Sequence, residues 1–343
     1  MIKKEVKDIR DLAEVLELST TTISRVLNGK SVKYRISEAT KLRVFKAASE
    51  YNYVPNKLAR GLKLDKTETI GLIIPDIADP FFADIARSIE LGARSKGYSL
   101  FLCDSGGDLV LEMEMINLML SHKVDGMIIA PVGTDYDHLL QAHKSGIPIV
   151  LVDRYFPEIE LPYITSDNFQ GSYDAVNYLI SIGHKRIACI QGIQNSQTSI
   201  DRVLGYRAAF EKNTISLDEN LIVGDNFNIE NGYKQTKILF SMDNPPTAIL
   251  ALSSKISLGV INALSELKLL IPDDISMIAF DEQPYCAYLG SPMTTIDMRK
   301  SEIGQLSVEV LIKYIENKTY YKKVVNIKLK TSLIIRESVK NIN

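Results

Sequence analysis

Apolar side chains recur at helical spacing in two short segments near the N-terminus. They fall on one face of Ile9–Leu16 and again on one face of Ser19–Leu27, where Ser19 is suited to cap the second segment. The tight connection between the segments predicts a helix-turn-helix, although a surface helix pair in an ordinary bundle fits the same pattern. The second helix would expose groups that suit phosphates and base edges in a DNA major groove. These groups belong to Thr20, Thr21, Ser24 and Arg25.

A third helix is predicted over Ser37–Tyr51, with Leu42 and Phe45 among the side chains that pack against the first two helices. Pro55 ends this helix because its ring and its missing N–H oppose continuation. The next residues, Asn56–Leu62, can form two helical turns, but so short a helix is marginal in water by itself. We therefore expect a linker that is helical only when something holds it.

From Thr69 onward, apolar β-rich runs alternate with helical patterns. Near-continuous apolar strands separated by helices predict parallel sheets covered on both faces. The length of this part, residues 69–335, favours two α/β lobes with a cleft between them over a single sheet. The predicted strands are Ile70–Ile74, Leu100–Cys103, Met127–Ala130, Ile147–Val152, Ile187–Ile190, Ala248–Leu252 and Ser276–Phe280.

Charge is divided unevenly along the chain. Hydrophobic residues make up 45% and charged residues 24% of the chain, which is typical of a soluble globular protein, and the formal net charge is −2. Residues 1–66 carry 15 Lys and Arg against 8 Asp and Glu, so the acidic excess lies entirely in the remainder. A basic head on an acidic body indicates that the head binds a polyanion.

The spacing of the cysteines and the N-terminal sequence indicate the cellular compartment. Cys103, Cys189 and Cys286 lie far apart among apolar neighbours, which favours buried reduced thiols. The chain starts without an apolar signal region and has no run of transmembrane length. We therefore expect a cytoplasmic protein with no membrane partner. The four histidines form no metal-ligand pattern, so we expect no metal site.

Polar and aromatic residues follow several of the predicted strands. The segment Asp76–Phe82 follows the first strand, Asp153 and Arg154 follow the fourth, and Asp281 follows a strand in the second half of the chain. Ligands of parallel α/β sheets bind at the carboxyl ends of the strands. These residues therefore mark a candidate cleft.

Several motifs, in order along nearly the whole chain, resemble the lactose/galactose repressor (LacI/GalR) family. The head, the linker Tyr53-Val-Pro-Asn-Lys-Leu-Ala-Arg and the strand Thr69-Ile-Gly-Leu-Ile-Ile-Pro-Asp carry this resemblance. Further matches are Asp125-Gly-Met-Ile-Ile, Gly183-His-Lys-Arg-Ile-Ala, Pro246-Thr-Ala-Ile, Leu270-Ile-Pro-Asp-Asp-Ile-Ser, Phe280-Asp and Thr294-Thr-Ile.

The resemblance implies a dimeric transcription regulator built from three parts. Residues 1–54 would form a helix-turn-helix head and residues 55–68 a hinge helix and linker. Residues 69–343 would form a periplasmic-binding-protein-like core of two doubly wound parallel-sheet lobes, with the chain crossing between them near residues 166 and 294. The implied partners are double-stranded operator DNA, a small-molecule effector and a second copy of the chain.

The resemblance also assigns DNA contacts. Thr20, Thr21 and Arg25 match positions that face the major groove, and Leu62 with Lys63 matches hinge residues that enter the minor groove. An apolar wedge there can unstack a base step and bend the DNA. The full set of expected DNA-binding residues is Ser19, Thr20, Thr21, Thr22, Ser24, Arg25, Asn28, Tyr53, Asn56, Ala59, Leu62 and Lys63.

Two features of the head depart from the family pattern. Glu17 occupies a turn position where the family often has glycine, so the turn must adopt strain or another geometry. The loop Ser31–Ile36 is longer than usual.

For the effector cleft, the resemblance implies aromatic walls and charged side chains that hold hydroxyl groups. Phe81 and Phe82 match effector-contact positions, and the pair Asp153-Arg154 looks like that of ribose-type binding proteins. This favours a neutral monosaccharide, in particular a pentose. Ser253 departs from the family, which usually has asparagine there. The expected effector-binding residues are Asp79, Phe81, Phe82, Asp153, Arg154, Arg202, Phe227, Ser253 and Asp281, with weaker cases for Asp104, Asp167, Gln283 and Arg299.

Three functions remain open from the sequence. The favoured one is a repressor of a carbohydrate-utilisation operon whose operator affinity is changed by a small sugar. A regulator that uses a purine or a protein co-repressor is the alternative. An enzyme fused to a helix-turn-helix head is less favoured, because the chain has no phosphate-cradling glycine motif at a strand-to-helix turn and no catalytic set in suitable context. We therefore expect no catalytic residues and no cofactor.

Overall fold

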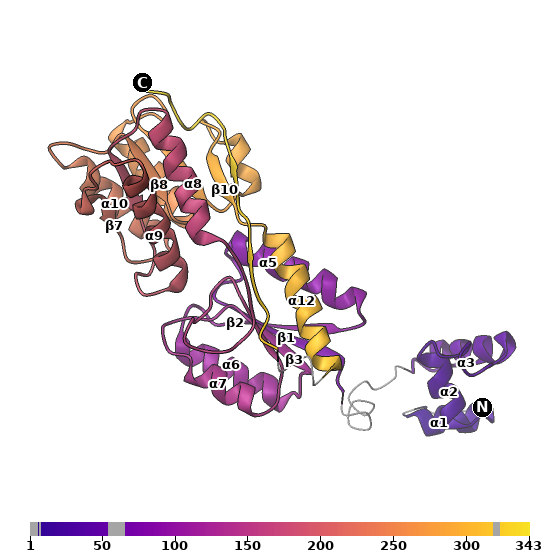
Figure 1. Cartoon of the computed structure of the whole chain (residues 1–343). Helices are drawn as coiled ribbons and strands as arrows, with labels where there is room; N and C mark the ends of the chain where they lie inside the picture. Colours follow the sequence, from indigo (N-terminus) through magenta and orange to yellow (C-terminus); the bar gives the residue numbers. More distant parts are fainter. Residues whose placement is uncertain (1–5, 7, 54–65, 318–322) are drawn as a thin grey trace. The chain divides into compact units, whose positions relative to one another are not determined.

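The computed structural model describes residues 6, 8–53, 66–317 and 323–343. The chain divides into two compact units, Met1–Thr67 and Glu68–Asn343, which are called the head and the core below (Figure 1). Four predicted hinge positions, Asn56, Ala59, Leu62 and Lys63, lie outside the described residues. In the part of the chain that is described, no helix is long and apolar enough to cross a membrane.

The head contains three helices around a small apolar core. They are α1 (Ile9–Leu16), α2 (Thr20–Leu27) and α3 (Glu38–Glu50). Serine or aspartate caps each of them: the Ser19 hydroxyl, for example, accepts from the Thr22 N–H at 3.0 Å. Leu12, Ile23, Val26 and Val44 are completely buried between the helices.

The sequence prediction for two apolar residues of α3 was wrong. Leu42 and Phe45 remain 67% and 44% exposed. The buried residues of α3 are Val44, Ala47 and Ala48, which share one face at helical spacing. Leu42 and Phe45 lie off that face, so hydrophobicity alone assigned them to the core incorrectly.

Glu17 forms the turn between α1 and α2 in a left-handed conformation, with φ 49° and ψ 42°. Its backbone N–H closes the end of α1 by donating to the Glu14 carbonyl at 3.3 Å, and the next N–H, of Leu18, donates to the Ala13 carbonyl at 3.0 Å. The turn therefore has the left-handed conformation that glycine adopts most easily. The Glu17 side chain makes this conformation sterically less favourable.

Replacing Glu17 by glycine is expected to stabilise the head by about 1 kcal/mol, because glycine adopts this conformation without a Cβ clash. Amide hydrogen exchange of α1 and α2 in the whole protein should slow by about fivefold, the equivalent of that free energy. Asn52→Gly is the matched control, since Asn52 is also left-handed (φ 51°) but asparagine tolerates this region. If both substitutions slowed the exchange equally, the inference that Glu17 is strained would be wrong.

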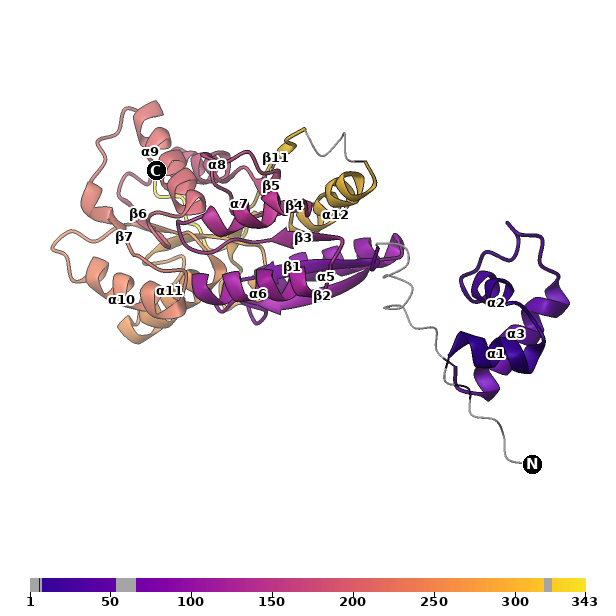
Figure 2. The same ribbon diagram turned by 90° about the horizontal axis from the view of Figure 1, so that it is seen from below.

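The first lobe of the core is a six-stranded parallel sheet in the order β11-β5-β4-β3-β1-β2 (Figure 2). Alternate residues of β1 pack on opposite faces, with Leu72 against α5 and α12 and Ile73 against α6 and α7. The elements are β1 (Thr69–Ile74), α5 (Pro80–Ser95), β2 (Ser99–Asp104), α6 (Leu109–Ser121), β3 (Gly126–Ile129), α7 (Asp137–Lys144), β4 (Ile149–Val152), β5 (Tyr163–Ser166), α12 (Lys300–Glu316) and β11 (Asn326–Leu329).

The second lobe repeats this plan with a sheet in the order β12-β10-β9-β8-β6-β7, in which only β12 is antiparallel. Helices α8 and α9 cover one face and α10 and α11 the other. The elements are α8 (Asn168–Ser181), β6 (Ile187–Ile190), α9 (Gln197–Lys212), η1 (Glu219–Leu221), β7 (Ile222–Val223), α10 (Ile229–Phe240), β8 (Ala248–Ala251), α11 (Ser254–Leu267), β9 (Ser276–Phe280), η2 (Pro284–Tyr288), β10 (Thr294–Asp297) and β12 (Ser332–Ile334). Cys103, Cys189 and Cys286 are free and buried, as predicted.

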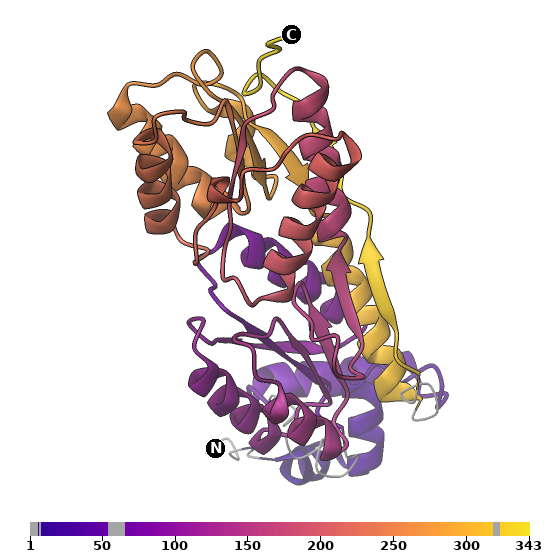
Figure 3. The same ribbon diagram turned by 60° about the vertical axis from the view of Figure 1, so that its left-hand side comes forward.

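The chain passes between the lobes at three places. It leaves the first sheet after β5, returns between β10 and α12, and leaves again between β11 and β12. Figure 3 shows the last passage in yellow, running along the side of both lobes. The sequence had indicated passages near residues 166 and 294 only. Three connecting segments thus join the lobes. The carboxyl ends of the strands in the two sheets face each other.

Candidate functional site

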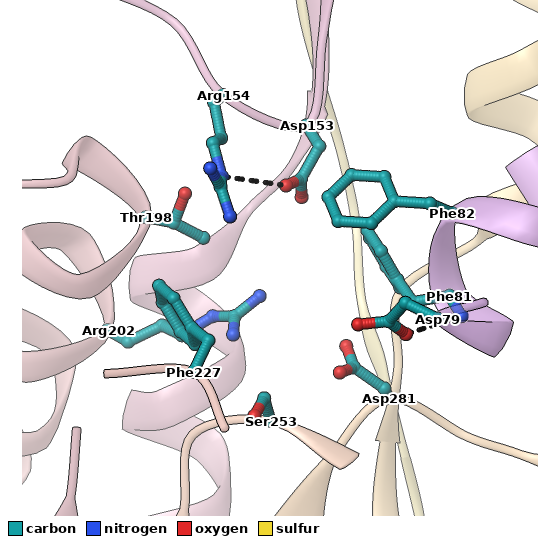
Figure 4. A pocket seen from close by; sticks show the side chains of 10 residues that line it. All are labelled: Asp79, Phe81, Phe82, Asp153, Arg154, Thr198, Arg202, Phe227, Ser253 and Asp281. Atoms are coloured by element: carbon teal, nitrogen blue, oxygen red, sulfur yellow. Dashed lines mark hydrogen bonds and ion pairs between the residues drawn. The ribbon is translucent and has the colours of Figure 1, made fainter. Parts of the chain in front are cut away.

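A pocket lies between the lobes, where β1, β4 and β9 end (Figure 4). All nine residues that the sequence predicts for the effector cleft line this one pocket, and Thr198 of α9 is a tenth. The lining residues are Asp79, Phe81, Phe82, Asp153, Arg154, Thr198, Arg202, Phe227, Ser253 and Asp281.

Two aspartates with a positive φ directly follow strands. Asp153 follows β4 with φ 63°, and Asp281 follows β9 with φ 72°. A positive φ is uncommon for residues other than glycine, although aspartate and asparagine adopt it more readily than most, and such conformations concentrate at binding sites. Figure 4 shows both carboxylates directed into the pocket. The Asp281 carboxylate also accepts from the Ser254 N–H at 3.0 Å, which holds it at the start of α11.

Two arginines supply the positive charge. Arg202 is 3% exposed, and its Nε donates to Asn168 Oδ1 at 2.7 Å. It also donates to the Leu252 carbonyl and lies 4.1 Å from the centre of the Phe280 ring. Arg202 is therefore held rigidly from the second lobe. Arg154 comes from the first lobe, and its Nε lies 3.8 Å from Asp153 Oδ2.

Aromatic rings form two walls of the pocket. The Arg154 guanidinium lies 5.8 Å from the centre of the Phe82 ring and 5.7 Å from that of Phe227. Phe81 contacts Phe82 edge-on, with ring centres 5.1 Å apart. Gly192 leaves space for the Phe227 ring, because a Cβ at that position would overlap it. The pocket thus joins flat apolar faces to charged hydrogen-bonding groups.

Burial controls the ionisation of the pocket. It raises the pKa of Asp153 to about 6, although Arg154 and Arg202 act in the opposite direction. Burial also raises the pKa of Asp79 and lowers that of Arg202, whose guanidinium remains charged. Asp153 Oδ1 and Thr198 Oγ1 are buried without a hydrogen-bond partner among the described residues. Such atoms are uncommon in native proteins unless a ligand or water satisfies them.

Polar contacts tie the lobes together on both sides of the pocket. On one side, Lys255 Nζ of α11 lies 2.5 Å from the Asp76 carboxylate and 3.5 Å from that of Asp79. On the other, the Tyr155 hydroxyl donates to the Asp201 carboxylate at 3.0 Å, and Lys328 Nζ lies 3.5 Å from the same group. These contacts join groups from different lobes, and Asp79 itself lines the pocket.

In the head, the predicted DNA-binding residues are not equally available. Thr20 and Thr21 are exposed on α2, while Ser24 and Arg25 are half-buried. The other predicted side chains on this helix have partners within the head: Ser19 and Thr22 bond each other at 2.8 Å, and Asn28 donates to the Ser24 carbonyl at 2.6 Å. Tyr53 packs against the head core.

Comparison with known proteins covers both units. Residues 6–56 match the bacterial regulatory proteins of the lacI family, and residues 67–337 match the periplasmic binding proteins and sugar-binding domain of the LacI family. The chain belongs to the LacI family. It is 32% identical over 337 residues to the transcriptional repressor PurR of Photobacterium profundum, which covers 98% of this chain and 99% of the relative. It is accordingly a DNA-binding transcriptional repressor, and its relatives are repressors rather than enzymes.

Two solved structures of the LacI family extend this result. The lac repressor dimer bound to operator and an anti-inducer has the same fold, with a TM-score of 0.84 over 98% of this chain and 99% of that one, at 24% identity. A regulator from Enterococcus faecium with bound ribose is 28% identical, with a TM-score of 0.71 over 80% of this chain and the whole of that one.

Within this LacI-family pocket, the sequence analysis missed one residue and included four others that do not line it. Thr198 lies four residues before Arg202 on α9, so helical spacing alone could have placed both on one face. Asp167 instead caps α8, and Arg299 pairs with Glu302. Asp104 accepts from backbone N–H groups of its own lobe, and the buried Gln283 is not among the lining residues.

Proposed function

We propose that this LacI-family repressor responds to a neutral, polyhydroxylated five- or six-carbon sugar ring, with a pentose favoured, bound in the pocket between the lobes. The observation that carries the proposal is the combination of charged hydrogen-bonding groups with two buried, unpartnered oxygens between phenylalanine walls. Aromatic faces suit the C–H surfaces of a sugar ring. Carboxylates and guanidinium groups suit its vicinal hydroxyls, since both can bond two of them at once.

The balance of charge favours a neutral ligand over a phosphorylated one. Three carboxylates, of Asp79, Asp153 and Asp281, face two guanidinium groups, of Arg154 and Arg202. A phosphate would add negative charge to a buried site that already holds more acids than bases. The ribose in the Enterococcus faecium regulator supports the same choice of ligand class.

For the DNA side, we propose that residues 1–54 bind operator through α2, with Thr20, Thr21 and Arg25 directed at the major groove. Residues 55–68, including Leu62, would form the hinge, and residues 69–343 the effector-binding and dimerisation core. The operator-bound dimer of the lac repressor supports a homodimer here, because two heads are needed to contact two half-sites. Sugar binding between the lobes would change operator affinity through their relative position.

A thermal-unfolding screen of the whole protein tests the effector class. Ribose or another neutral pentose at 100 times its dissociation constant should stabilise the core by about 2.7 kcal/mol and raise its unfolding midpoint accordingly. Neutral hexoses, sugar phosphates and free purines form the comparison set. A rise with phosphates or purines alone would refute the neutral-sugar proposal while leaving the repressor assignment in place.

A further inference from the structure

We propose that Tyr34, in the long loop after α2, positions Arg25 for base recognition and so contributes to the operator sequence preference. The Arg25 guanidinium carbon lies 3.8 Å from the centre of the Tyr34 ring. The inference rests on the proposed role of α2 in operator binding. It adds a residue outside the recognition helix that neither the sequence motifs nor the family match assigns.

The loop that carries Tyr34 has a defined backbone. The Tyr34 N–H donates to the Lys30 carbonyl at 3.2 Å, and the Ile36 N–H donates to the Ser31 carbonyl at 2.9 Å. Ser31 at one end of the loop is 5% exposed, and Ile36 at the other packs against the head core. A buried residue at one end, a half-buried residue at the other and the internal hydrogen bonds define the course of the backbone that carries Tyr34. The contact with Arg25 is therefore set by the fold of the head.

Stacking leaves the guanidinium able to read bases. An aromatic ring covers one face of the group, whereas the N–H donors point outward in its plane. Those in-plane donors are the ones that bond guanine O6 and N7 in the major groove. A carboxylate partner would occupy the same donors, and no carboxylate lies within ion-pair distance of Arg25 in the described part of the head. Tyr34 thus restrains Arg25 without competing with DNA.

We expect Tyr34 to increase operator affinity because it restrains the Arg25 side chain before DNA binds. A free arginine side chain loses rotamer freedom when it docks on a base, and a side chain already held by stacking loses less. A single exposed Arg–aromatic contact corresponds to on the order of a twofold to fivefold change in an equilibrium constant. Lys33 Nζ lies 6.0 Å from the same ring, at the outer limit for such an interaction, and is the natural control.

A double-mutant cycle on the full-length protein tests the proposal. The probe is a duplex selected by the wild-type protein from random-sequence DNA, and a scrambled duplex measures non-specific binding. We expect Tyr34→Ala to weaken binding to the selected duplex by about twofold to fivefold and to leave the scrambled duplex unaffected. Tyr34→Phe should bind like wild type, because the ring is retained. In an Arg25→Ala background, Tyr34→Ala should have no further effect. Thermal unfolding of each variant checks the head.

Base-pair substitution supplies a readout that a purely structural role would not move. Replacing the base pair that Arg25 reads should weaken binding of the wild-type protein but not of Arg25→Ala. In Tyr34→Ala, the same replacement should weaken binding by less than it does in the wild type. Lys33→Ala should instead weaken both duplexes alike, as expected for a phosphate contact.

Three results would overturn the proposal. Equal effects of Tyr34→Ala with and without Arg25 would make Tyr34 an independent contact, and a loss in Tyr34→Phe would assign the role to its hydroxyl. An Arg25→Ala variant that binds the selected duplex normally would overturn the proposed role of α2 as well, which distinguishes the two failures.

Discussion

Arg202→Ala is expected to abolish the response to the effector, weakening effector binding by at least about 30-fold. Removing one member of a buried, hydrogen-bonded charge set costs about 2–5 kcal/mol, since the remaining groups lose their partner. Here the carboxylates of Asp153 and Asp281 would face a pocket that has lost its rigid guanidinium. Titration calorimetry with the sugar that gives the thermal shift measures the loss directly.

Operator binding without effector should persist in Arg202→Ala, because the head is a separate compact unit. Thermal unfolding of the core shows whether the variant folds, because Arg202 lies in the core and not in the head. Arg207→Ala is the matched control: Arg207 lies on the same helix, is half-exposed, and pairs with Glu219 away from the pocket. If Arg202→Ala bound the sugar as tightly as wild type, the pocket would not be the effector site.

The sequence predicted most of the pocket because its residues follow strands. Asp153 and Asp281 come directly after apolar runs, and Phe82 lies in the first turn of the helix after β1. Carboxyl ends of parallel strands share one edge of a sheet, so residues distant in the chain converge there without any knowledge of loop conformation. Arg202 lies within a helix, and only the resemblance to the family placed it.

Other features depend on tertiary contacts that local patterns do not encode. The third passage between the lobes depends on the pairing of β11 with β5 in one sheet and of β12 with β10 in the other. The exposure of Leu42 and Phe45 reflects which face of α3 meets its neighbours. The contact of Tyr34 with Arg25 arises from a loop whose course follows from the packing of its two ends against the head. In each case the apolar or polar character of the residue is compatible with more than one position.

Asp153→Asn is expected to stabilise the effector-free core while weakening effector binding. The pKa of Asp153 is raised to about 6, and the dominant cause is burial of the carboxylate away from water. Between the ordinary aspartate pKa and about 6, the folded state holds more protons at this site than the unfolded state does. Stability from this group therefore falls as pH rises through that window, and the full cost is present above pH 6.

A shift of this size corresponds to about 3 kcal/mol at neutral pH. The neutral amide avoids that cost, so Asp153→Asn should raise the unfolding midpoint of the core at pH 7.5 and change it little near pH 4. Asp243→Asn, at an exposed position, should leave the midpoint unchanged at both values. A lower midpoint for Asp153→Asn at pH 7.5 would show that Arg154 and Arg202 stabilise the carboxylate by more than burial destabilises it.

Effector affinity should move in the opposite direction. The amide keeps the shape of the side chain but replaces a charged acceptor, one oxygen of which has no partner within the protein, by a neutral group. Charge-assisted hydrogen bonds are roughly twice as strong as neutral ones, so the sugar should bind at least about tenfold more weakly. In the wild type, the same loss should appear as pH falls below about 6, where Asp153 takes up a proton, and it should be absent from the variant. A core made more stable by losing its ligand group would mean that Asp153 is retained for binding at the expense of stability.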